Sequence, residues 1–144
     1  MRTIHHVLDI DAPCDDVWAA LTEVKELAGW WSTVVTGDPS APGGRIDFTF
    51  AGDFNPSMEV TSIDPGGLLA WKCVAGHSNW DDNTFTFEVV PRGEDGSRLR
   101  FTQHYAVELS DDDYGIYNFN WGYYLESLRL LCSTGTGKPF RISA

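Results

Sequence analysis

The sequence predicts an α+β protein in which a curved antiparallel β-sheet wraps around one long C-terminal helix. Residues 113–134 carry apolar side chains at steps of three and four, which is typical of an amphipathic helix. Between residues 45 and 107, five segments alternate apolar and polar side chains, as half-buried strands do. Only the long helix could cover the apolar face of those strands, so we expect a sheet layer and a helix layer.

Three short elements precede the five alternating segments. Residues 3–10 alternate loosely and are rich in β-forming side chains, which predicts a first strand. Residues 11–23 predict a short helix, because Pro13 suits a first helical position and acidic residues follow it. Residues 24–28 predict one further helical turn. Residues 31–44 are rich in turn-forming residues, and we expect a loop there.

Turns rich in glycine, proline and aspartate separate the alternating segments from one another. We expect the five strands at residues 45–50, 58–63, 69–74, 84–90 and 97–107. Ser110 provides an N-cap for the long helix, and Gly135 followed by Pro139 provides its end.

Composition limits the classes of function. A chain of 144 residues is typical of a single domain, which we expect to span residues 1–144. The net charge of −11 argues against a nucleic-acid partner, which requires a basic face. No apolar run approaches the roughly 18 residues of a membrane span, so we expect no membrane insertion.

Cysteine and histidine usage points to a reducing compartment and away from metal binding. The three cysteines have no paired spacing, and no signal-like segment precedes the first strand, so we expect reduced thiols in a cytoplasmic protein. The four histidines do not have the spacing of a zinc site. We expect neither a metal nor a cofactor.

Several local motifs occur in an order that resembles a known superfamily. The motifs are Ile10-Asp-Ala-Pro13 with Val17-Trp18-Ala-Ala-Leu21, the pair Trp30-Trp31, Gly44-Arg-Ile-Asp-Phe48, Met58-Glu-Val60, the Trp71 strand, Phe85-Thr-Phe87, and Trp121…Leu125…Leu128 followed by Gly135-Thr-Gly137-Lys-Pro139. Together they resemble the START-like, or SRPBCC (Bet v-type helix-grip), superfamily. Within it, the resemblance is to the group named for the activator of the heat-shock-protein-90 ATPase.

This resemblance implies a helix-grip fold with a cavity for small apolar molecules between the sheet and the C-terminal helix. It implies no single reaction, because the superfamily includes lipid and hormone carriers as well as aromatase/cyclases. One position departs from the pattern of many relatives, which carry a histidine inside the last strand where this chain has Gln103. Glutamine does not exchange protons near neutral pH, so an acid–base role at this position is not supported.

The candidate ligand-binding residues are aromatic or apolar side chains predicted to face the space between sheet and helix. From the loop and strands they are Trp30, Trp31, Phe48, Phe50, Met58, Trp71, Phe85, Phe87 and Phe101, and from the helix Tyr117, Trp121 and Tyr124. Each of the strand residues taken alone is more simply explained as core packing. Collectively they form an aromatic wall of the kind that lines ligand pockets.

Gln103 completes the candidate set as a polar residue in register with the inward-facing Leu99 and Phe101. A buried amide needs partners, so it either bonds a neighbour such as a tyrosine hydroxyl or orients the polar end of a ligand. His77 and Trp80 lie in a predicted loop at the rim, where an ordinary surface role is the simpler interpretation.

Three functions remain open from the sequence. The first is binding of a small hydrophobic, aromatic or lipid-like ligand in the predicted cavity. The second is a polyketide cyclase/hydrolase-type enzyme that uses the same cavity, with Tyr117, Tyr124, Gln103 and His77 as candidate groups. The third is a chaperone-regulating interaction module. A homodimer formed through a sheet edge is compatible with each of these functions.

Overall fold

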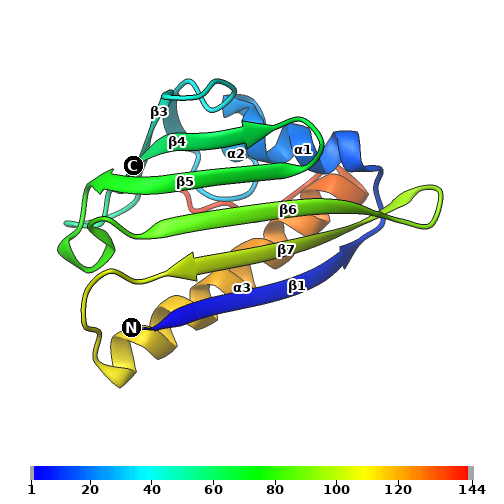
Figure 1. Ribbon diagram of the computed structural model, residues 1–144. Coiled ribbons are helices and arrows are strands. Elements are labelled where there is room, and N and C mark those ends of the chain that lie inside the picture. Colours follow the sequence, from blue (N-terminus) through cyan, green and yellow to red (C-terminus); the bar gives the residue numbers. More distant parts are fainter. Residues whose placement is uncertain (1, 143–144) are drawn as a thin grey trace.

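The long C-terminal helix α3 lies across one face of a curved seven-stranded sheet in the computed structural model, which describes residues 2–142 (Figure 1). The elements in chain order are β1 (Thr3–Ile10), α1 (Cys14–Thr22), α2 (Val24–Leu27), β2 (Val34–Gly37), β3 (Arg45–Thr49), β4 (Ser57–Asp64), β5 (Leu68–Ala75), the 3₁₀ turn η1 (Ser78–Trp80), β6 (Thr84–Arg92), β7 (Gly96–His104) and α3 (Asp111–Thr134). This arrangement confirms the predicted α+β helix-grip fold.

The sheet is antiparallel throughout and has the strand order β1-β7-β6-β5-β4-β3-β2. Strands β2 to β7 follow one another along the chain and pair as a meander, and β7 then pairs with β1, the first strand of the chain. The β4–β5 register shifts between Val60 and Ser62, and such irregularities increase the local twist and bend of a sheet. The apolar side chains of alternating residues face α3 and form the core.

Strand β2 corrects the sequence prediction of a loop over residues 31–44. Val34 to Gly37 pair with β3, and Val35 opposite Phe48 is buried. Four residues are too few to display an alternating pattern, and the turn residues that follow Thr36 obscure the end of the strand. The last strand also ends earlier than predicted, at His104 rather than residue 107.

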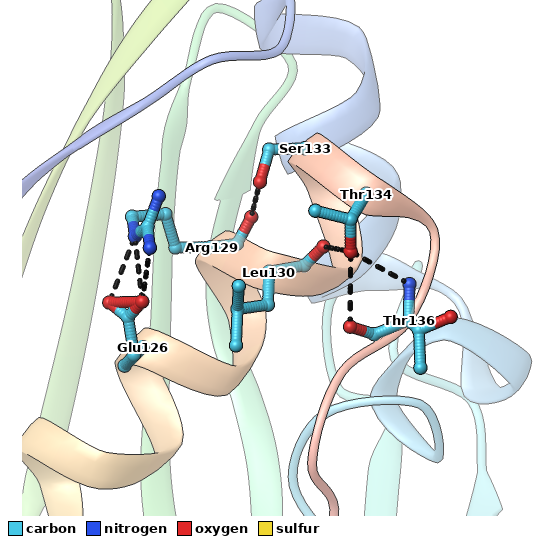
Figure 2. Close-up of polar contacts among 6 residues, drawn as sticks. All are labelled: Glu126, Arg129, Leu130, Ser133, Thr134 and Thr136. Atoms are coloured by element: carbon cyan, nitrogen blue, oxygen red, sulfur yellow. Dashed lines mark hydrogen bonds and ion pairs between the residues drawn. The ribbon is translucent and has the colours of Figure 1, made fainter.

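Helix α3 has well-defined caps at both ends. The Ser110 hydroxyl accepts a hydrogen bond from the Asp113 amide at 3.0 Å, and Gly135 ends the helix in the left-handed region at φ 87°. Figure 2 shows the final turns, where Ser133 and Thr134 donate to the carbonyls of Arg129 and Leu130, both at 2.7 Å. The Arg129 guanidinium also forms an ion pair with Glu126 one turn earlier.

After α3 the chain turns back beneath the loop that follows α2. The Ser127 hydroxyl donates to the Trp30 carbonyl at 2.9 Å and accepts from the Lys138 amide at 2.6 Å. A side chain at Gly137 would collide with the backbone carbonyls of Gly29 and Ser127, so this close approach requires glycine. The returning segment then pairs with Ser32, which fixes Phe140 next to Trp31.

A buried hydrogen bond joins α3 to the sheet. The Trp121 indole Nε1 donates to Gln103 Oε1 at 2.7 Å, and both side chains are inaccessible to solvent or nearly so. This contact supplies one of the hydrogen-bond partners that the buried Gln103 amide needs. Its oxygen is paired with an indole rather than a tyrosine hydroxyl, whereas its Nε2 group has no hydrogen-bond partner among residues 2–142.

We predict that Trp121→Phe lowers the free energy of unfolding by about 2–4 kcal/mol, because it creates a void and leaves the buried Gln103 oxygen unpaired. Urea denaturation measures this loss. The double variant Trp121→Phe/Gln103→Met removes the unpaired amide as well, and it should be about 1 kcal/mol more stable than Trp121→Phe alone. If the losses of unfolding free energy in Trp121→Phe and Gln103→Met add up to the loss in the double variant, the hydrogen bond contributes nothing to stability.

Candidate functional site

A layer of tryptophan rings fills the centre of the space between sheet and helix. The Trp31 ring stacks at a centroid distance of 5.1 Å on Trp121 of α3 and at 6.3 Å on Trp71 of β5. Trp80 lies nearly parallel to Trp121 at 6.0 Å, with 6° between the ring planes. Because these rings interlock, the expected void does not lie under the middle of the sheet.

The void lies instead at one end of the sheet, between α3 and the loops that connect the strands there. It is a cavity of about 340 Å³, at the lower end of the range of small-molecule sites. Helix α3 contributes Tyr117, Asn120, Trp121 and Tyr124 to one wall. These residues recur at steps of three and four, so they share one face of the helix.

The opposite wall comes from two loops. The chain after β3 contributes Phe50, Ala51 and Phe54, and the loop between β5 and β6 contributes His77 and Trp80. Phe54 packs edge-on against Trp80 at 4.9 Å and lies 5.7 Å from the His77 ring, so the two loops support each other.

The remaining wall joins the loop after α2 to the C-terminal segment. Trp31 and Phe140 both line the cavity, and Phe140 is held there by backbone hydrogen bonds with Trp31 and Thr33 at 2.8 and 3.0 Å. Phe50 contacts both rings, at 5.2 Å from Trp31 and 5.5 Å from Phe140. The cavity is therefore bounded mainly by aromatic faces.

The structure places the candidate residues in two groups. Trp31, Phe50, Tyr117, Trp121 and Tyr124 line the cavity. The others are fully buried in the core behind it, namely Trp30, Phe48, Met58, Trp71, Phe85, Phe87, Phe101 and Gln103. Trp30 makes a structural contact there, because its Nε1 donates to the Ala20 carbonyl at 2.7 Å. Ligand binding by the cavity-lining group remains a prediction.

Six residues of the lining were absent from the candidate ligand-binding set: Ala51, Phe54, His77, Trp80, Asn120 and Phe140. The sequence analysis favoured an ordinary surface role for His77 and Trp80, but both line the cavity and Trp80 is buried. Phe54 lies inside a segment whose Gly52 and Pro56 indicate a turn, and Phe140 follows the end of α3. An aromatic ring within an otherwise polar turn was the available signal for Phe54. Nothing local in the sequence indicates that the chain returns to bring Phe140 to the cavity.

Hydrogen-bond donors dominate the polar groups of the lining. Burial raises the pKa of Tyr117, a hydrogen bond from Asn79 opposes this, and the carboxylates of Asp113 and Asp53 raise the pKa further. Burial also raises the pKa of Tyr124. Both phenols therefore keep their protons near neutral pH, where they can donate hydrogen bonds but cannot act as bases.

Nucleophilic and metal chemistry find little support in the side chains near the cavity. Burial is the main factor that raises the pKa of the Cys73 thiol to about 11, so at neutral pH it is a thiol rather than a thiolate. Within residues 2–142, no three histidine, cysteine, aspartate or glutamate side chains lie close enough together to hold a metal ion. None of the helices in this range is long and apolar enough to cross a membrane.

The buried Cys73 thiol gives a testable pH dependence. Above pH 9 the unfolded chain loses this proton, whereas the folded protein keeps it until about pH 11. The free energy of unfolding should therefore fall as pH rises through this window, by about 1.4 kcal/mol per pH unit for this group. Urea denaturation at pH 8.5 and 10.5 measures the fall. Cys73→Ala should show a smaller fall than the wild type, and an equal fall would contradict the assignment.

The chain is similar in sequence and structure to known proteins. The family model described as "Activator of Hsp90 ATPase homolog 1-like protein" matches residues 11–132. No curated protein sequence matches. The solution structure of the Aha1 dimer from Colwellia psychrerythraea superposes with a TM-score of 0.83 at 27% identity, covering 95% of this chain and 100% of that one.

Two more distant structures share the fold. Protein MLL2253 from Mesorhizobium loti is 23% identical, with a TM-score of 0.78 over 90% of this chain and 96% of its own. Norcoclaurine synthase from Thalictrum flavum, solved in complex with dopamine and hydroxybenzaldehyde, is 18% identical, with a TM-score of 0.65 over 90% of this chain and 85% of its own.

Proposed function

This chain belongs to the family of activator of Hsp90 ATPase homolog 1-like proteins, and we propose that it uses the helix-grip fold to bind a small, flat, largely apolar molecule in the cavity beside α3. The observation that carries this proposal is the composition of the walls. Three indole rings, those of Trp31, Trp80 and Trp121, border the cavity. Pre-formed apolar clefts with few polar groups are the usual form of small-molecule sites.

The size of the cavity limits the ligand. About 340 Å³ is on the order of ten water volumes, which accommodates one or two fused rings rather than a long acyl chain. A ligand of about 12 heavy atoms gaining about 0.5 kcal/mol per atom would bind with a Kd of roughly tens of micromolar. Its rings would stack on indole faces, which contributes beyond simple burial of area.

Ala51→Trp tests the proposal by filling the cavity. Ala51 lines the cavity but is exposed, so a larger side chain can extend into the void without disturbing the core. We predict at least about tenfold weaker binding of an aromatic probe such as 2-ethylnaphthalene, measured by quenching of tryptophan fluorescence. Val7→Trp is the matched control, because Val7 is an exposed β1 residue outside the cavity lining. Equal affinity of the two variants would contradict the proposed site.

A second proposal is self-association through the outer face of α3. Ile116, Phe119 and Tyr123 lie on this face at steps of three and four, and they are 56%, 67% and 49% exposed. Contiguous exposed apolar side chains are typical of interaction surfaces. The Colwellia psychrerythraea relative is described as a dimer, which supports a second copy of the chain as the partner.

Charge around Phe119 favours a two-fold arrangement. The hollow on one side of Phe119 is bordered by Asp111 and Asp112, and the hollow on the other side by Lys138 and Arg141. A two-fold axis near Phe119 would place the acidic hollow of one copy against the basic hollow of the other. The same patch on both copies would then be self-complementary.

Phe119→Lys should therefore shift the protein toward monomer, because it places a charge at the centre of the proposed interface. Sedimentation equilibrium measures the change in mass. Leu68→Lys, at an exposed apolar position on β5, is the control and should leave the mass unchanged. A wild-type protein that remains monomeric at high micromolar concentration would refute the proposal.

A further inference from the structure

Asn79 holds two of the side chains that line the cavity. Its backbone amide donates to Nδ1 of His77 at 3.0 Å, and its side-chain Nδ2 donates to the Tyr117 hydroxyl at 3.2 Å. His77 and Tyr117 come from the β5–β6 loop and from α3, and both rings lie beside Phe54, at 5.7 and 6.2 Å. One asparagine thus sets the hydrogen-bonding state of two groups at the same end of the cavity.

The bond from Asn79 fixes the tautomer of His77. A backbone amide can only donate, so Nδ1 must present its lone pair. The proton of the neutral ring is therefore on Nε2. Asp53 Oδ2 lies 3.8 Å from Nε2, beyond hydrogen-bond distance. His77, which is part of the cavity lining, therefore has an N–H that makes no hydrogen bond within residues 2–142.

The same residue leaves Tyr117 as a donor. The Tyr117 oxygen already accepts a hydrogen from Asn79, and its own O–H bonds no acceptor within residues 2–142. A phenol that accepts one hydrogen bond is free to donate another. His77 and Tyr117 thus both have protons that make no hydrogen bond within residues 2–142.

The charges around this end disfavour an anion. Asp53 lies beside His77, and the carboxylates of Asp53 and Asp113 both act on the Tyr117 hydroxyl. The protein as a whole carries a net charge of −11. These negative charges would repel a carboxylate or phenolate head group, whereas they would not repel an uncharged acceptor.

We infer that the ligand is an uncharged aromatic compound with a carbonyl-type oxygen, which accepts hydrogen bonds from His77 Nε2 and the Tyr117 hydroxyl. This inference rests on the proposed function, since it concerns the same cavity. The rings of the ligand would lie among the indoles, and its oxygen would lie at the end bordered by Phe54. Asn79 acts as a positioning residue, because it sets the state of the two donors.

Probes that share one ring system test the inference. The set comprises 2-acetylnaphthalene, the similarly shaped 2-ethylnaphthalene, the anion 2-naphthoate and the cation trimethyl(2-naphthyl)ammonium. Affinities are measured by isothermal titration calorimetry. We expect the acetyl compound to bind about fivefold more tightly than the ethyl compound, as one net hydrogen bond allows, and both ions to bind more weakly than the acetyl compound.

Three variants identify the source of that preference. Tyr117→Phe and His77→Phe each remove one donor and keep an aromatic ring, so each should weaken binding of the acetyl compound more than binding of the ethyl compound and thereby reduce the acetyl-to-ethyl ratio. Asn79→Asp replaces the side-chain donor with a carboxylate that accepts the hydrogen bond of the Tyr117 hydroxyl. It should therefore reduce the acetyl-to-ethyl ratio to the value found for Tyr117→Phe. A merely structural role for Asn79 would instead weaken both compounds equally.

The outcomes separate this inference from the proposed function. Binding of 2-ethylnaphthalene with no preference for the acetyl compound would overturn the inference and leave the cavity as a binding site. Tightest binding of either ion would also overturn it. Failure of all four probes to bind would reject the proposed function for ligands of this class, and the inference with it.

Discussion

The stack of Trp31 between sheet and helix is the constraint on which the rest of the structure depends. Trp31 lies on Trp121 of α3 at 5.1 Å and on Trp71 of β5 at 6.3 Å, so it fills the middle of the grip. The Trp121–Gln103 hydrogen bond joins α3 to β7 beside this stack. The aromatic rings fill the centre of the space between sheet and helix, and the cavity lies where the loops meet the first half of α3.

The spacing of apolar and aromatic residues was enough to predict the fold and about half of the cavity lining. The steps from Tyr117 through Trp121 to Tyr124 placed these side chains on one face of a helix, and the alternation of residues 45–50 placed Phe50 on the inner face of a strand. The sequence could not tell which inward rings would border the void. Phe48 and Phe50 share one face, yet Phe48 packs under Trp31 at 4.4 Å while Phe50 reaches the cavity.

The parts that sequence reasoning missed depend on long-range contacts. Phe140 reaches the cavity because its segment pairs with Ser32, and Gly137 permits that return by passing close to Gly29. Likewise, the donor state of His77 depends on one backbone amide two residues further along the chain. Periodicity reports which face a side chain occupies, but it does not report which partners complete its hydrogen bonds.

Indole NMR resonances test the central claim most directly, because five of the six tryptophan rings divide between cavity and core. During titration with 2-ethylnaphthalene, the Nε1–H signals of Trp31, Trp80 and Trp121 should shift, since these rings border the void. The signals of Trp30 and Trp71, which are fully buried behind it, should stay nearly fixed. If none of the signals moves at saturating probe, or if the core pair moves as far as the cavity group, the ligand does not occupy this cavity.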